Sequence, residues 1–263
     1  MRVFVIGEMA SAHDGELAKA KRLVNVAVDA GCDAVKVQFW SDADRLADRR
    51  RVPKYYRDIY RRYQIPVEWL TILKDYCGDR IEFMATCFLP EDVKTVSPFI
   101  KRFKVSAFES HANDLIKETI RWANDRQIIV SGNEIIGIPD TLASRIGINV
   151  AVLYCVTAYP APLEIINLRM MSGQVSGYSD HSGDIDMGAY AVCAGALIVE
   201  AHMALANTDA LNPDGGSFAH LPWAFKQYVS NIRKAESVCR ADTKESNLSD
   251  EEEAMRKYHV VTS

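Results

Sequence analysis

The sequence has no run of 18 apolar residues, no C-x-x-C pair and no stripe of basic residues. Without a long apolar run there is no candidate membrane span. The six cysteines are scattered and mostly lie inside apolar runs, so we expect buried, reduced thiols. The net charge is −4, which gives no sign of nucleic-acid binding. The N-terminus enters a strand pattern without a signal peptide, and we therefore expect a cytoplasmic protein.

The length and composition suit a single soluble domain. The chain has 263 residues, of which 48% are hydrophobic and 25% are charged. This is a common size for one α/β barrel. We expect the barrel to occupy residues 1–240, followed by a tail or linker remnant at 241–263.

Short β-branched runs alternate with amphipathic helical patterns along the chain. Eight strands are predicted, at 2–8, 34–39, 82–86, 102–106, 128–132, 150–155, 176–179 and 196–200. Helices are predicted at 16–31, 67–78, 113–125, 139–147, 186–195 and 221–238. Strand–helix alternation implies parallel pairing, and eight such units favour a closed (β/α)₈ TIM barrel.

A long insertion between Phe39 and Pro66 interrupts the second unit and is rich in Arg and Tyr. Its basic cluster, RLADRRR (45–51), is predicted to be loop-like. We interpret the cluster chiefly as a solvated face, with attraction of an anionic ligand as the alternative. A loop of this length is more often functional than decorative.

Polar residues collect at the C-terminal ends of the predicted strands, where barrels of this class carry their active sites. They are Glu8, Lys36, Gln38, Thr86, Lys104, Ser106, Glu109, Thr157, Tyr159, Ser179, Asp180, His181, Glu200 and His202. Lysine is costly to bury alone, so Lys36 and Lys104 indicate an anionic ligand such as a phosphate or carboxylate. The alternative for each lysine is a structural pair with a nearby acid.

Two histidines follow neighbouring strands. His181 and His202 suit a divalent metal that keeps open positions, although each alone is more often structural. Glu8, Glu109 and Asp214 could orient hydroxyls or move protons. For Asp214, which lies in NPDGGSF (212–218), plain turn chemistry is an equal alternative.

The chain resembles the sialic acid synthases, which condense phosphoenolpyruvate with an aldehyde sugar. The resemblance covers most of the chain, from Glu8 to about Val238. It is most specific in AVKVQF (34–39), CVTAYPAPLEIINL (155–168), GYSDHS (177–182) and IVEAHM (198–203).

The resemblance implies roles for these residues. The phosphoenolpyruvate pocket would consist of Lys36, Gln38, Thr86, Lys104, Ser106, Thr157 and Ser179. A divalent cation, Mn²⁺ or Mg²⁺, would bind His181 and His202 beside Glu8. Glu109, Tyr159 and Asp214 would face the sugar. The product would be a sialic-type or 3-deoxy-ulosonic acid, with release of phosphate.

Several positions depart from the family pattern. Ala12 replaces the usual Asn before His13, and Cys87 replaces a proline. The donor and metal positions are mostly kept while the sugar-facing ones drift, which suggests the same reaction on a different aldehyde. Family members also carry a small antifreeze-like domain after the barrel. This domain is absent from the sequence, and three explanations stay open: the cap is a separate protein, the acceptor needs no cap, or the chain has been shortened. We also expect a homodimer formed through faces of the barrel.

Two other functions stay open from the sequence. One is a metal-dependent barrel aldolase or isomerase that uses another three-carbon donor. The other is a non-catalytic barrel that serves as a binding subunit.

Overall fold

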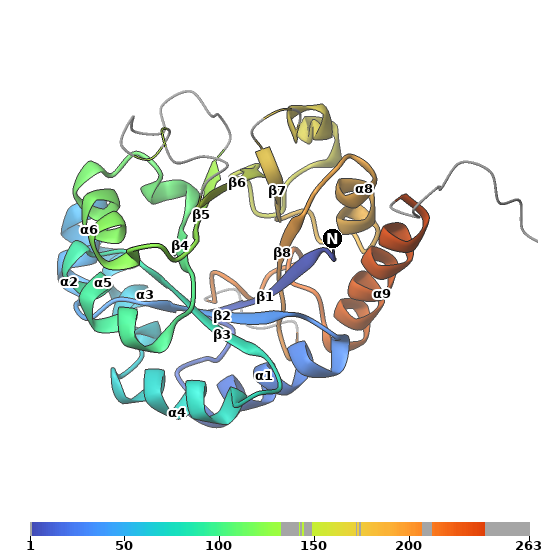
Figure 1. The fold of residues 1–263 in the computed structure, drawn as a ribbon. Helices are drawn as coiled ribbons and strands as arrows, with labels where there is room; N and C mark the ends of the chain where they lie inside the picture. The colour runs from blue at the N-terminus through green and yellow to red at the C-terminus, as the bar shows by residue number, and fades with distance from the viewer. Residues whose placement is uncertain are drawn as a thin grey trace, which may run out of the picture.

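The structure, a computed structural model, describes residues 2–132, 149–171, 175–206 and 212–239, together with positions 142, 144 and 173. Eight parallel strands form a closed barrel in the order β1 to β8 (Figure 1). They are β1 (Phe4–Ala10), β2 (Ala34–Phe39), β3 (Glu82–Cys87), β4 (Phe103–Val105), β5 (Ile128–Gly132), β6 (Val150–Cys155), β7 (Val175–Asp180) and β8 (Ile198–His202). The predicted TIM barrel and all eight of its strands are confirmed.

Helices surround the barrel in the described part of the chain. They are α1 (Leu17–Ala30), α2 (Ala43–Arg50), α3 (Lys54–Tyr63), α4 (Glu68–Cys77), α5 (Pro90–Val96), α6 (Asn113–Ala123), α8 (Met187–Cys193) and α9 (Pro222–Cys239). Five of the six predicted helices are confirmed. The sixth, at 139–147, lies mostly outside the described residues, and the predicted tail at 241–263 lies wholly outside them. No described helix is long and apolar enough to cross a membrane.

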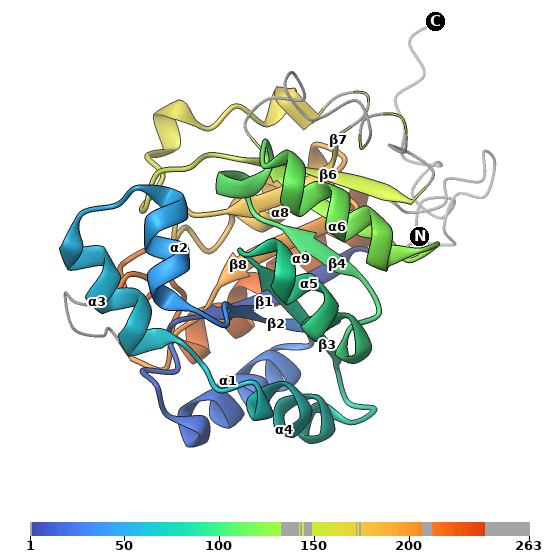
Figure 2. The same cartoon turned by 90° about the vertical axis from the view of Figure 1, so that its left-hand side faces the viewer.

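The insertion after β2 is not a loop, as the sequence predicted, but a pair of helices. Helix α2 begins at an aspartate cap, because Asp42 accepts hydrogen bonds from the backbone of Asp44 and Arg45. Leu46 and Ile59 anchor α2 and α3 in a small apolar cluster with Trp40 and Phe88. Figure 2 shows both helices at the end of the barrel opposite the start of β1.

The strands alternate between two environments. On β2, Val35 and Val37 face the helices and join the main core. Ala34, on the other face, joins a small cluster that fills the barrel interior, whose other buried members are Ile6, Met84, Ile129, Ala151, Leu153 and Ile198. Because strand side chains alternate, the next inward positions lie one layer further toward the strand C-termini. That layer is polar and holds the candidate site.

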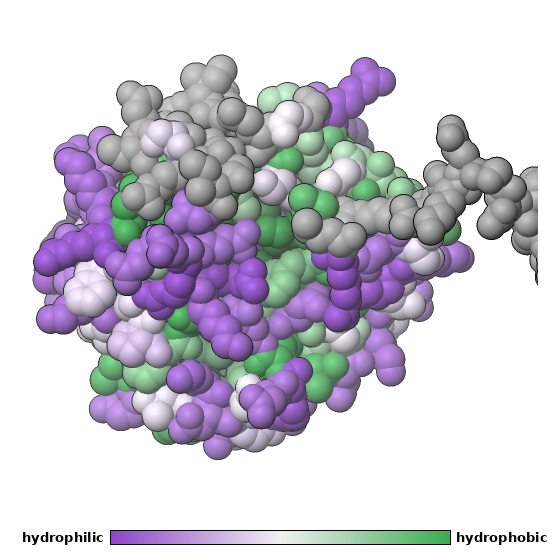
Figure 3. All heavy atoms as spheres, in the orientation of Figure 1, coloured by the Kyte–Doolittle hydropathy of each residue, from purple (hydrophilic) through white to green (hydrophobic). Residues whose placement is uncertain are grey.

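The face that Figure 3 presents is dominated by hydrophilic side chains, with apolar ones visible in small areas between them. Helix α9 packs outside the barrel and contacts the residues that directly precede β1 and β2. Arg233 binds Asp33 at 2.7 Å, and Glu236 accepts a hydrogen bond from the backbone of Val3. These contacts join both ends of the barrel sequence.

Candidate active site

A cavity of about 1150 Å³ opens at the C-terminal ends of the strands. Most of the residues predicted for the site line it, namely Glu8, Lys36, Gln38, Thr86, Lys104, Ser106, Glu109, Tyr159, Ser179, His181, His202 and Asp214. Strand register brings them together, because Glu8 pairs with both Lys36 and His202 in the barrel sheet. Thr86 similarly pairs with Lys104.

Thr157 is the exception among the predicted site residues. Its side chain is exposed, and it is absent from the cavity lining. Strand β6 ends at Cys155, which still points into the cavity. Beyond that point strand alternation no longer holds, so Thr157 does not repeat the orientation of Cys155.

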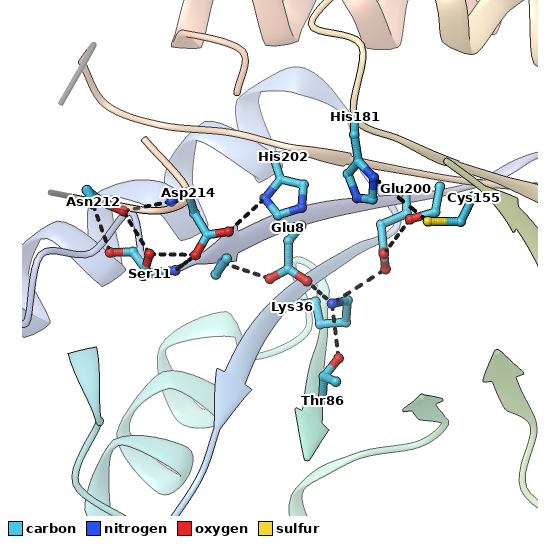
Figure 4. A network of polar contacts seen from close by, with 12 residues as sticks. Glu8, Ser11, Lys36, Thr86, Cys155, His181, Glu200, His202, Asn212 and Asp214 are labelled. Carbon is cyan, nitrogen blue, oxygen red and sulfur yellow. Dashed lines mark hydrogen bonds and ion pairs between the residues drawn. The ribbon is translucent and has the colours of Figure 1, made fainter. Parts of the chain in front are cut away.

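Two buried lysines, Lys36 and Lys104, line the cavity and are bridged by the buried Glu200. Figure 4 shows Glu200 directed toward Lys36. Glu200 lies 3.6 Å from Lys36 Nζ and 3.4 Å from Lys104 Nζ. Lys36 also pairs with Glu8 and donates to Thr86 Oγ1 at 3.0 Å. The lysines therefore have acidic partners, as the structural alternative required, and they also border the cavity.

Burial and charge oppose each other in this network. Burial lowers the pKa of Lys36 to about 8, although Glu200 opposes the change. Burial would raise the pKa of Glu200, but the charges of Lys104 and Lys36 outweigh it and hold that pKa at about 2. At neutral pH the glutamate is ionised and Lys36 is mostly protonated. An incoming anion therefore meets an ammonium group that is already desolvated.

His181 and His202 lie side by side, with ring centroids 5.3 Å apart. His181 Nδ1 is 2.8 Å from the carbonyl oxygen of Val156. Because a carbonyl only accepts, Nδ1 carries the proton and Nε2 keeps its lone pair. His202 Nδ1 is buried and has no hydrogen-bond partner among the described residues.

Both imidazoles are neutral at ordinary pH, because burial lowers each pKa to about 3. Neutral imidazole is the form that binds metals. Within the described residues, no three or more His, Cys, Asp or Glu side chains gather closely enough to hold an ion. The pair therefore suits a site in which other ligands come from water or substrate.

Hydrogen bonds between the turn at Ser11 and the loop at 212–214 hold Asp214 beside His202. Its Oδ1 lies 3.7 Å from His202 Nδ1, and its Oδ2 accepts from the backbone nitrogen of Ser11 at 3.1 Å. Ser11 Oγ also donates to Asn212 at 2.7 Å. Burial raises the pKa of Asp214. This turn thus aims a carboxyl group at the histidine pair.

The outer part of the cavity carries an ion pair that the sequence did not predict. Arg50, from the basic cluster interpreted as a solvated face, binds Glu109 at 2.6 Å. Glu109 also accepts a hydrogen bond from Ser106. In the same part of the cavity, the aromatic ring of Tyr159 packs against the imidazole of His181, with ring centroids 4.2 Å apart. The interpretation of the cluster as solvated is therefore wrong for Arg50.

Three further residues belong to this site. The sequence placed Glu200 at a strand end but gave it no role. Ser131 lies near the C-terminal end of β5, lines the cavity and accepts a hydrogen bond from Lys104 Nζ at 2.8 Å. The same strand-end rule would have found Ser131. Ser11 lies in a turn, and its contact with the loop at 212–214 spans about two hundred residues. No local signal indicated that contact.

The fold and the cavity define a class of protein: a TIM barrel whose pocket is lined by hydroxyl groups and two acid-paired lysines, beside two neutral histidines. Sequence comparison gives the family. Residues 23–244 match the family model described as the NeuB family, and the chain belongs to that family. It is a family of phosphoenolpyruvate-condensing synthases.

Individual relatives agree with this membership. The chain is 29% identical to the spore coat polysaccharide biosynthesis protein SpsE of Bacillus subtilis, covering 89% of this chain and 68% of the relative. It is 26% identical to a pseudaminic acid synthase of Campylobacter jejuni, covering 90% of this chain and 75% of the relative.

Solved structures support the fold. The N-acetylneuraminic acid synthetase of Leptospira borgpetersenii superposes with a TM-score of 0.85 at 22% identity, covering 98% of this chain and 92% of that one. At this identity the similarity supports the fold alone.

Proposed function

We propose that the protein condenses phosphoenolpyruvate with an aldehyde sugar to form a sialic-type or 3-deoxy-ulosonic acid and phosphate. The observation that carries the proposal is the pair of buried lysines, Lys36 and Lys104, facing the same cavity as His181 and His202. Family membership supports the donor, and the cavity has room for a second substrate above it.

The donor pocket that we propose consists of Lys36, Gln38, Thr86, Lys104, Ser106 and Ser179. Thr157 is left out because it does not line the cavity. The ammonium groups would neutralise the phosphate and carboxylate of the donor, and the hydroxyls would hydrogen-bond their oxygens. Aimed groups of this kind, in a water-poor site, each contribute several kcal/mol to transition-state stabilisation, roughly 3 kcal/mol per donor.

We propose that His181 and His202 hold a divalent cation, Mn²⁺ or Mg²⁺. The fit rests on His202 Nδ1, which has no hydrogen bond among the described residues, and on the proton position of His181, which leaves Nε2 free to ligate. Glu8 would face the aqua ligands. When bound, such a cation supplies Lewis-acid polarisation of a carbonyl oxygen.

The chain's own groups would surround the bond-forming step. Carbon 3 of phosphoenolpyruvate attacks the aldehyde carbon, water adds at carbon 2, and phosphate leaves with cleavage of its C–O bond. The lysines hold the donor anion throughout, while Asp214, Glu109 and Tyr159 would orient the hydroxyls of the acceptor. Asp214 has a raised pKa, which suits a group that exchanges protons.

An assay with phosphoenolpyruvate, Mn²⁺ and a panel of aldehyde sugars tests the proposal. Phosphate release that requires both substrates, with a product mass equal to the acceptor plus pyruvate, supports it. Consumption of another three-carbon donor would favour an aldolase or isomerase instead. Absence of donor binding would favour a non-catalytic subunit.

A further inference from the structure

Arg50 reaches from the end of α2 into the cavity, where its guanidinium donates hydrogen bonds to Glu109 and Tyr60. Its Nε and Nη2 donate to Glu109 Oε1 at 3.0 and 2.6 Å. Its Nη1 donates to the hydroxyl of Tyr60 at 3.1 Å. The guanidinium carbon lies 4.7 Å from the ring centre of Phe88 and 5.5 Å from that of Phe108. Such a position fixes the charge in place, because a planar guanidinium is held by both stacking and paired hydrogen bonds.

Glu109 is a buried carboxylate, with a side chain only 5% exposed. One of its oxygens is held by Arg50, and the other accepts a hydrogen bond from Ser106. Ser106 follows Lys104 by two residues at the end of β4, and both line the cavity. The contacts therefore run without a break from the insertion to the proposed donor pocket.

This arrangement matters because the proposed donor is an anion. A carboxylate beside Ser106 without a counter-charge would repel a phosphate or carboxylate group bound there. Little water is present at a buried site to screen that repulsion. Arg50 supplies the counter-charge, and its hydrogen bonds direct Glu109 toward Ser106.

We propose that Arg50 is a positioning residue for donor binding: it neutralises Glu109 and, through it, fixes Ser106 in the anion pocket. The inference rests on the proposed function for the identity of the donor. It adds a residue from the α2–α3 insertion to a site otherwise built from strand ends.

Arg57 offers a matched control in the same insertion. It binds Asp44 at 3.1 Å and also pairs with Asp48, and these carboxylates are 46% and 69% exposed. Exposed pairs of this kind contribute little. Arg57→Ala therefore removes one arginine and its ion pairs from the insertion without changing the charge of the cavity.

The experiment measures binding of phosphoenolpyruvate by titration calorimetry, with Mn²⁺ present and no acceptor. Arg50→Ala should weaken binding at least about tenfold, whereas Arg57→Ala should match the wild type. Arg50→Lys should recover part of the loss, because it restores the charge but not the paired hydrogen bonds. The double variant Arg50→Ala/Glu109→Gln should bind the donor more tightly than Arg50→Ala, because the uncompensated negative charge is gone.

Three results would overturn the inference. Unchanged binding in Arg50→Ala is one, and an equal loss in Arg57→Ala is another. The third is a double variant that binds no better than Arg50→Ala, which would show that the charge of Glu109 is not the cause of the weaker binding. Failure of the wild type to bind phosphoenolpyruvate is a different result, because it would refute the proposed function itself.

Discussion

His220 allows a test of how burial controls the acid stability of this barrel. Its ring packs against Tyr228, with centroids 4.6 Å apart, and its Nε2 is buried with no hydrogen-bond partner among the described residues. Burial lowers the pKa of His220 to about 4, although Asp184 opposes the change. In the unfolded chain the pKa returns to about 6.5. Between these values the unfolded state binds a proton that the folded state does not, so stability falls as the pH falls through 6.5 toward 4.

The magnitude follows from the same two pKa values. Between pH 7 and pH 5 this histidine should cost about 2 kcal/mol of unfolding free energy, because each pKa unit corresponds to about 1.4 kcal/mol. Substitution by Phe or Gln removes the titrating group. For each variant we compare its free energy of unfolding with that of the wild type at the same pH. This difference should shift in favour of the variant by about 2 kcal/mol between pH 7 and pH 5.

Urea unfolding at the two pH values, followed by circular dichroism, measures this difference. The comparison is independent of what each substitution does at pH 7, since only the change with pH is used. Two variants of different polarity guard against a packing artefact. A pH-independent stability difference in both variants would show that His220 is not held neutral by burial.

Three further predictions follow from burial and contact. Lys104→Ala should lower turnover by roughly a hundredfold or more while the circular dichroism spectrum is retained; normal turnover would exclude this lysine from the site. In the native protein, a thiol reagent should label Cys193 and Cys239 quickly and the four buried cysteines slowly; rapid labelling of all six would contradict the described burial. Gly177→Ala should destabilise the barrel on the order of 3 kcal/mol, because a Cβ there would lie 2.0 Å from the carbonyl oxygen of Ile198. An unchanged urea midpoint would refute that contact.

The barrel was predictable from the sequence because its strands are short, β-branched runs with regular spacing. Helices α2 and α3 were not, because their apolar faces are small. Helix α2 buries only Ala43, Leu46 and Ala47, and it ends at Arg51 in the left-handed conformation rather than at a glycine. Neither the usual apolar stripe nor the usual stop signal was present.

The candidate site followed from one rule, that inward side chains at strand C-termini share a layer. The rule placed Lys36, Lys104 and the histidines in the cavity but failed for Thr157, where β6 had already ended. It also could not find Arg50, because that residue comes from a helix outside the barrel sheet. Contacts between distant loops depend on tertiary packing that no local pattern records.

The most direct test of the account is a crystal structure with Mn²⁺ and phosphoenolpyruvate, using anomalous scattering to locate the metal. The account predicts a manganese peak bound by His181 and His202, with the phosphate and carboxylate of the donor held by Lys36 and Lys104. A metal peak elsewhere, or a donor bound away from both lysines, would contradict it.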